Sequence, residues 1–320
     1  MDIRRISGLA YSRNIKQSQD QQLNVLQENM RSRVNGVLWI ACGAALWGTD
    51  TVFRRPLTES LDPARIVLYE HAILSLIVLP IVFRGRAYLP KIAPRTWLAL
   101  LGISWVGSAI ATILFTAAIR SGSPTTAVLL QKTQPIFAIL LARIVTQEKW
   151  PAFFPLLAAI AIAGGYLVAF GDGNLLRPLG SVEMIPALLA IGAAVGWAFA
   201  TVWGRLVTKD LPFELITGLR VLCALPLLLF VTFVQHQMAM PRSADLPSLI
   251  WMALIPGFAG LMLYYRGLMH TPASRATIAE LAFPITASLL NWIVLGIPTS
   301  FIQFAGFGIV WSAILSLRRL

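Results

Sequence analysis

Long apolar runs restrict the fold of this chain more than any other feature of its sequence. A helix that crosses a bilayer needs about 20 predominantly apolar residues. Ten runs approach or exceed that length, at about 36–53, 64–83, 97–119, 125–145, 151–170, 184–204, 213–234, 248–269, 275–296 and 300–317. Backbone groups in lipid must form their hydrogen bonds within the segment, so runs of this length are helices. We therefore expect an all-α membrane protein with ten transmembrane helices.

The composition agrees with this class of protein. Of 320 residues, 57% are hydrophobic and 12% are charged, and the mean hydropathy is +0.72. A soluble protein has about 25% charged residues. Cys42 and Cys223 both lie within apolar runs, so neither a disulfide framework nor a cysteine metal cluster is expected. We expect no metal site and no cofactor.

The Lys and Arg residues predict the orientation in the membrane. If the N-terminus is inside, 17 of the 26 fall on the inner side, six on the outer side and three within the runs. The positive-inside rule then places both termini and the loop at 84–95 in the cytoplasm, with the chain in the inner (plasma) membrane. This asymmetry also accounts for the net charge of +12 without nucleic-acid binding.

The sequence repeats itself after about 150 residues. The segment "ALWGTDTVFRRPLTESLDP" aligns with "VGWAFATVWGRLVTKDLP", which pairs Trp47 with Trp197. At an offset of 149, "SGSPTTAVLLQKTQP" aligns with "HTPASRATIAELAFP", which pairs Pro135 with Pro284. Each copy holds five runs, so the two halves enter the membrane from opposite sides, as in inverted-repeat transporters.

These patterns predict three regions of the chain. Residues 1–35 are polar and rich in Gln and Asn, and are expected to form a disordered cytoplasmic tail. The first five-helix repeat follows at 36–170, and the second at 184–318.

The ten runs, the repeat and the segment "AAIRSGSPTTAVLLQKTQPIFAILLARIVTQE" resemble the drug/metabolite transporter superfamily, specifically its EamA-type permeases. In that family the fourth helix of each repeat follows a short turn, carries a proline near its middle, and reaches the fifth helix through a Gly-Glu or similar step. Pro135 and Glu148 match this pattern in the first repeat. In the second repeat Pro284 matches, but Ile297 stands in place of the glutamate. The resemblance implies a ten-helix permease, with export as the expected direction.

The two prolines indicate where a substrate site could lie. Proline removes the helix hydrogen bond to the carbonyl four residues back, so Pro135 is expected to free the carbonyl of Gln131. By the same argument Pro284 frees the carbonyl of Glu280, the counterpart of Gln131 in the repeat. Each repeat therefore places a polar side chain and an unpaired carbonyl together at mid-membrane, where a cavity or a partner must satisfy them.

Lys132 lies one residue beyond Gln131, and a lysine at that depth costs roughly 2.5–3.5 kcal/mol on insertion scales. In one interpretation Lys132 pairs with a fixed acid, such as Glu280, Glu70 or Asp50, and locks the bundle. In the other it faces a central water-filled cavity and binds an anionic group of the substrate. We favour the second, because ionisable residues within spans often mark substrate or ion pathways.

Other polar and aromatic residues within the runs have two interpretations each. Glu70 and His71 could relay protons or pack as a helix pair. Arg220, which aligns with His71 at the offset of 149, is assigned to the substrate site. Trp47 and Trp197 could stack on a substrate or simply pack in the membrane.

Asp50 and Arg54 are four residues apart and are expected to form an intrahelical pair near the outer surface.

The sequence carries no nucleotide-binding loop and no paired acid and base typical of an enzyme. It predicts a non-enzymatic secondary transporter of small polar metabolites that works by alternating access around a midplane site. A zwitterion such as an amino acid fits Lys132 on one side and Glu280 on the other. A more anionic metabolite or a nucleotide sugar is the alternative, followed by a non-transporting membrane protein. The expected partners are a small-molecule substrate and the lipid bilayer, with proton coupling and oligomeric state left open.

Overall fold

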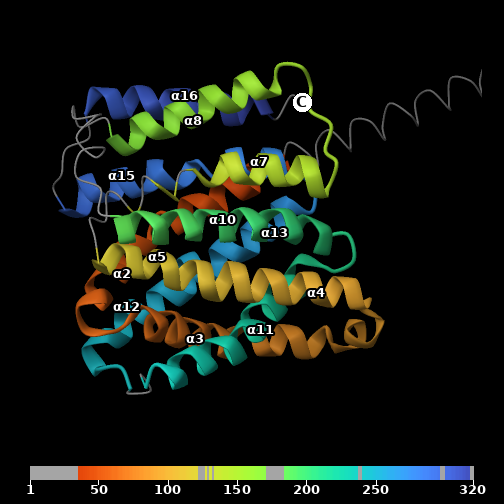
Figure 1. Ribbon diagram of the computed structural model, residues 1–320, viewed down its shortest axis with the longest axis vertical. Coiled ribbons are helices and arrows are strands. Elements are labelled where there is room, and N and C mark those ends of the chain that lie inside the picture. The colour runs from red at the N-terminus through yellow and green to blue at the C-terminus, as the bar shows by residue number, and fades with distance from the viewer. Residues whose placement is uncertain are drawn as a thin grey trace, which may run out of the picture.

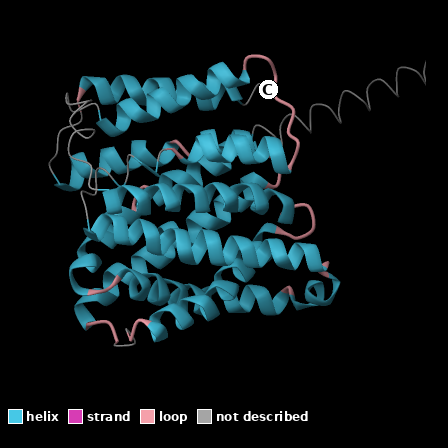
Figure 2. Cartoon of the chain, in the orientation of Figure 1, coloured by secondary structure: helices cyan, strands magenta, loops and turns pink. Residues whose placement is uncertain are grey.

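The computed structural model describes residues 35–121, 127, 130–131, 133–170, 184–236, 240–295 and 300–317. Figure 2 shows that the regular elements in these ranges are helices joined by loops. The prediction of an all-helical protein is confirmed for this part of the chain. Lys132, Ile297 and the tail before Asn35 lie outside the described residues.

Six described helices are long and apolar enough to cross a membrane. They are Asn35–Ser60, which ends in α2 (Asp50–Ser60), Pro63–Arg84 (α3), Pro94–Ser121, Met184–Val207 (α10), Phe213–Val234 (α11) and Ser243–Leu268. Shorter helices cover the other expected runs: α7 (Gln134–Val145), α8 (Phe154–Phe170), α14 (Ala273–Ala279), α15 (Ala282–Leu295) and α16 (Phe301–Leu317). Six helices therefore reach spanning length, and the count of ten spans stays a prediction.

The third helix of each half widens in its middle. In the first half α4 (Pro94–Gly102) continues through the π-helical η2 (Ile103–Ile110) into α5 (Ala111–Ser121). In the second half α12 (Leu246–Met252) continues through the π-helical η4 (Ala253–Gly260) into α13 (Leu261–Leu268). The two wide stretches occupy positions related by the 150-residue repeat, and such stretches are frequent at functional sites.

The fourth helix of each half is interrupted just before its proline. Pro135 lies in the first turn of α7, and Pro284 lies in the first turn of α15. Proline is tolerated there because the first turn has no hydrogen-bond acceptor for its N–H. The expectation of a freed carbonyl is wrong at Glu280, whose carbonyl accepts the N–H of Phe283 at 3.0 Å. The helix breaks ahead of Pro284, and the Glu280 carbonyl accepts its hydrogen bond within the tight turn at this break.

Helices from the first half pack against helices from the second half throughout the molecule. Figure 1 shows α8 beside α16 at one end of the long axis and α3 beside α11 at the other. Between these layers α5 packs on α10, α2 on α12, and α7 on both α10 and α14. The interface between the two halves is therefore also the centre of the bundle.

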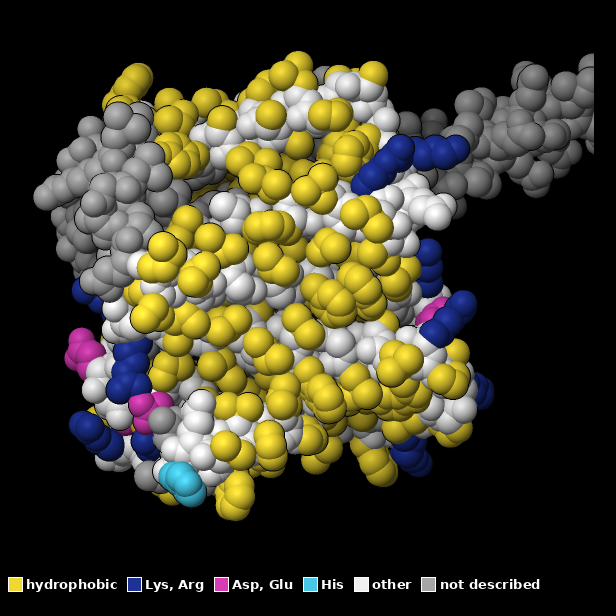
Figure 3. Space-filling model, in the orientation of Figure 1, with side chains coloured by type: hydrophobic (Ala, Val, Ile, Leu, Met, Phe, Trp, Pro, Cys, Tyr) yellow, Lys and Arg dark blue, Asp and Glu magenta, His cyan; other side chains and the backbone are white. Residues whose placement is uncertain are grey.

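The surface suits a lipid environment. Figure 3 shows hydrophobic side chains spread across the middle of the visible face, with Lys and Arg gathered toward its left and right edges. Exposed apolar side chains are large and numerous, for example Leu76 (76% exposed), Ile144 (74%) and Phe301 (87%). An apolar belt of this kind marks a surface that lipid covers.

Glu148, in the loop after α7, joins the two halves at one end of the bundle. Its carboxylate accepts the backbone N–H groups of Ala273 at 2.8 Å and Ser274 at 3.1 Å, and also the Ser274 hydroxyl. These N–H groups belong to the first turn of α14, which has no intrahelical acceptor for them. Glu148 therefore caps a helix of the opposite repeat.

Candidate binding site

A cavity of about 170 Å³ lies between the two halves. The sequence assigned ten residues to substrate binding, a helix break or proton coupling. The cavity wall includes eight of them: Trp47, Glu70, His71, Gln131, Pro135, Trp197, Arg220 and Glu280. Of the other two, Pro284 is not part of the wall and Lys132 lies outside the described residues. The fold thus brings together side chains that are far apart in the sequence.

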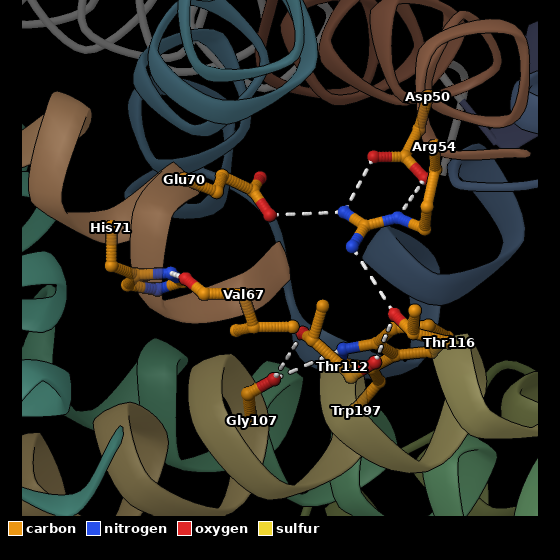
Figure 4. Close-up of polar contacts among 9 residues, drawn as sticks. All are labelled: Asp50, Arg54, Val67, Glu70, His71, Gly107, Thr112, Thr116 and Trp197. Carbon is orange, nitrogen blue, oxygen red and sulfur yellow. Dashed lines mark hydrogen bonds and ion pairs between the residues drawn. The ribbon is translucent and has the colours of Figure 1, made fainter. Parts of the chain in front are cut away.

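Arg54 forms a buried ion-pair cluster at one side of this cavity (Figure 4). Its Nε and Nη2 contact the two oxygens of Asp50 at 2.6 and 2.7 Å, and Nη2 also contacts Glu70 at 3.0 Å. Its Nη1 donates to the hydroxyl of Thr116 at 3.2 Å. The predicted pair of Asp50 and Arg54 is confirmed, and its position near the outer side of the membrane stays a prediction. Arg54 is only 2% exposed, and Glu70 of α3 is its second acidic partner.

Glu70 and His71 have separate partners (Figure 4). The Glu70 carboxylate faces Arg54, whereas Nδ1 of His71 lies 2.9 Å from the carbonyl of Val67, one turn back on the same helix. Because a carbonyl only accepts, Nδ1 of His71 carries the hydrogen in this contact. The two side chains are adjacent in the sequence, yet each is held by a different group.

Among the described residues, the hydrogen-bond partners of Arg220 in α11 are neutral groups. Its Nε donates to the hydroxyl of Ser108 at 2.6 Å, and its Nη1 donates to the hydroxyl of Tyr265 at 2.8 Å. Arg220 is 7% exposed. Within the described ranges no carboxylate lies within the 4.0 Å of an ion pair with it. This buried guanidinium is thus fixed in the cavity wall without an acidic ion-pair partner in the described part of the chain.

Glu280 lies where the ninth apolar run breaks, between α14 and α15. Its carboxylate accepts a hydrogen bond from the side-chain amide of Gln134 at 2.7 Å and another from the Thr201 hydroxyl at 3.2 Å. Tyr264 in turn donates to Thr201 at 3.0 Å. A chain of polar groups from both halves therefore fixes this carboxylate at the cavity.

The two repeat-related tryptophans both line the cavity and both pack against other rings. Trp197 donates its indole N–H to the carbonyl of Gly107 at 3.0 Å, and its ring centre lies 5.2 Å from that of Phe115. The ring centre of Trp47 lies 4.9 Å from that of Tyr264. Both interpretations of these residues, packing and substrate contact, are compatible with this geometry.

Sequence reasoning missed several polar residues of the wall. These are Ser108, Thr112, Gln134, Thr201, Tyr264 and Thr277. Gln134 had a signal, since it stands directly before Pro135, whereas hydroxyl residues in apolar runs are too common to be singled out. Thr277 is fully buried, and its hydroxyl oxygen has no hydrogen-bond partner in the part of the chain that the structure describes. In the described part of the chain, no group of three or more His, Cys, Asp or Glu residues is placed to hold a metal ion.

Comparisons with known proteins agree on the class. The EamA-like transporter family matches the chain twice, at residues 34–170 and 184–319. The riboflavin transporter ImpX of Fusobacterium nucleatum is 28% identical over 300 residues, which cover 91% of this chain and 100% of ImpX. The uncharacterized transporter YdfC of Bacillus subtilis is 25% identical over 79% of this chain and 81% of its own length.

A solved crystal structure supports the fold in three dimensions. It superposes with a TM-score of 0.66 at 15% identity, over 87% of this chain and 94% of its own. At that identity the likeness concerns the fold alone. The two family matches, which together cover most of the sequence, settle the class: this chain belongs to the EamA-like transporter family, with two copies of the family's domain.

Proposed function

We propose that this chain is a secondary transporter that moves a small polar metabolite, such as an amino acid, through the central cavity by alternating access. The observation that carries the proposal is the presence of opposite charges in the wall of one cavity. Arg220 and Glu280 both line the cavity, and they come from α11 and from the break between α14 and α15. A zwitterion can present its carboxylate to the first and its ammonium group to the second.

The proposed architecture is a ten-helix bundle of two inverted repeats, 36–170 and 184–318, in the inner membrane with both termini cytoplasmic. The packing of first-half helices on second-half helices supports it, as do the matching π-helical stretches. In Figure 1 the last turn of α16 lies on the same side of the bundle as the loop 85–93 between α3 and α4. The excess of Lys and Arg on that side favours the cytoplasm. Export is the proposed direction.

Glu70 and His71 remain the candidates for proton coupling, and Lys132 remains a candidate for contact with the substrate. Glu70 shares Arg54 with Asp50, so protonation of one acid would leave the arginine still paired with the other. This arrangement tolerates a change of one charge, which a proton-coupled cycle requires.

Riboflavin is the second candidate substrate. It is supported by the relative named for riboflavin transport and by the aromatic residues of the wall, Trp47, Phe115, Trp197, Tyr264 and Phe283. A flat ring system can stack on such side chains. A more anionic metabolite or a nucleotide sugar would instead draw on the positive charge of Arg220.

The proposal is tested by uptake into proteoliposomes that contain the full-length chain. The panel comprises amino acids, riboflavin and anionic metabolites, each measured with and without an imposed proton gradient, with protein-free liposomes as control. We expect saturable uptake of one substrate class, inhibited by its unlabelled members. Uptake equal to that of protein-free liposomes for the whole panel would contradict the proposal.

A further inference from the structure

We propose that Arg220 is the anion-binding group of the cavity, so that the transported molecule carries an acidic function, a carboxylate or a phosphate. This inference rests on the proposed transport function and narrows its substrate class. It follows from a comparison of the two arginines that line the same cavity.

Arg54 and Arg220 are both buried but differ in their hydrogen-bond partners. Arg54 is 2% exposed and contacts the carboxylates of Asp50 and Glu70. Arg220 is 7% exposed, and its described partners are the hydroxyls of Ser108 and Tyr265. A buried charge is costly unless an opposite charge compensates it. Arg54 has two acidic ion-pair partners, whereas Arg220 has none among the described residues, so a bound anion could supply the opposite charge.

The two hydroxyl contacts determine which nitrogen of Arg220 can bind a ligand. Nε donates to Ser108 and Nη1 donates to Tyr265. The guanidinium also lies over the Tyr265 ring, 5.7 Å from its centre. Nη2 has no described partner, so the N–H donors of that nitrogen are available to an anion. The side chain is already fixed before a ligand arrives, which lowers the entropy lost on binding.

Gly107 keeps the space beside Nη2 open. A β-carbon at this position would lie 3.1 Å from Nη2 of Arg220 and 2.4 Å from the β-carbon of Ala200. A larger residue would therefore push on the guanidinium and on α10 at once. The site thus combines a pre-positioned cation, a donor nitrogen without a described partner and a small residue next to it, all in the wall of the cavity.

The predicted selectivity can be tested with pairs of molecules that differ only in the acidic function. Riboflavin has no acidic group that is ionised at neutral pH, and flavin mononucleotide is the same molecule with a phosphate. Phenylalanine and phenylalaninamide form the corresponding pair for a carboxylate. Binding to the full-length chain in detergent is measured by thermal shift and by quenching of the ten tryptophans.

We expect the wild type to bind the acidic member of at least one pair at least tenfold more tightly than the neutral member. Arg220→Gln should reduce that affinity at least tenfold and leave the neutral member unaffected, because the glutamine offers the anion no charged hydrogen-bond donor. Arg220→Lys keeps the charge but not the planar fork, so an intermediate affinity is expected. Arg266→Gln is the matched control, since Arg266 is an exposed arginine that lies over Trp39, outside the cavity wall.

The two pairs also separate the two kinds of anion. Preference for flavin mononucleotide alone identifies a phosphate site, and preference for phenylalanine alone identifies a carboxylate site. Equal or tighter binding of the neutral members, failure of both acidic probes to bind, or unchanged affinity in Arg220→Gln would overturn the proposal. If Arg220→Gln does not fold, the proposal is tested by the affinities of the wild type for the acidic and neutral probes and by the affinity of Arg220→Lys for the acidic probe. Selective binding of an acidic probe without transport of any compound would contradict the proposed function and leave Arg220 as the anion-binding group. Transport of a neutral substrate that Arg220→Lys does not affect would contradict this inference and leave the proposed function standing.

Discussion

Gln134 donates a hydrogen bond of 2.7 Å to the carboxylate of Glu280, 146 residues away in the sequence. Gln134 begins α7, directly before Pro135, and Glu280 lies at the break before α15. The contact thus joins the interrupted fourth helices of the two repeats across the cavity wall. Because both side chains are buried, each satisfies a polar group of the other that would be costly to leave unpaired.

Replacing Arg54 should destabilise the fold. Arg54→Met leaves the partly buried carboxylate of Asp50 and the buried carboxylate of Glu70 without their shared cation. Breaking a buried ion pair from one side costs roughly 3–5 kcal/mol, so a large fall in the melting temperature in detergent is expected. Arg55→Gln is the control, because Arg55 is the exposed residue next to Arg54 in the sequence. This variant should have the melting temperature of the wild type. Similar melting of both variants would contradict the structural role of the cluster.

Thr277→Val should leave stability unchanged or raise it. Thr277 is fully buried and its hydroxyl has no described hydrogen-bond partner, so the substitution of similar shape removes an unsatisfied polar atom. An unpaired buried hydroxyl costs about 1–3 kcal/mol. Thermal melting in detergent measures the change. A clear loss of stability would show that the hydroxyl is satisfied in the folded protein.

Glu148→Ala should weaken the end of the bundle where α14 begins. The variant loses the acceptor for the N–H groups of Ala273 and Ser274, and loss of such a cap costs about 0.5–2 kcal/mol. Amide hydrogen exchange should become faster in the first turn of α14 while α11 keeps its protection. Lys149→Ala, a change at the exposed neighbour, should leave this exchange as in the wild type. Equal protection of α14 in both variants would argue against the cap.

The loop 85–93 should face the cytoplasm. Tyr88 is 50% exposed, so Tyr88→Cys in a variant without Cys42 and Cys223 offers a single accessible thiol. An impermeant maleimide should label it in inverted membrane vesicles and not in intact cells. Labelling in intact cells alone would reverse the proposed orientation of the whole chain.

The helices could be predicted from the sequence because insertion into lipid depends on the length and hydrophobicity of a segment. The expected run 213–234, for example, has the bounds of α11. The breaks near Pro135 and Pro284 could also be predicted, because proline constrains only the residues beside it. The state of the Glu280 carbonyl could not, since it depends on where the helix restarts.

The contacts around the cavity were mostly beyond prediction. Asp50 and Arg54 are one turn apart, so their pair follows from helix geometry. Glu70 joins them from another helix, and Ser108 reaches Arg220 across 112 residues. Such contacts depend on how α3, η2 and α11 pack together. The spacing of residues within one helix does not predict that packing.

Uptake into proteoliposomes by the wild type and by Glu280→Gln tests the central claim, that a charged metabolite passes through this cavity. The glutamine keeps an oxygen that can accept the hydrogen bond from Gln134, so the variant should fold and melt like the wild type. It lacks the charge that the proposal assigns to binding the substrate, and a charged hydrogen bond of about 1.5–3 kcal/mol corresponds to a roughly 10- to 100-fold loss of uptake at low substrate concentration. The account predicts that loss in a folded variant, and uptake at the wild-type rate by Glu280→Gln would contradict it.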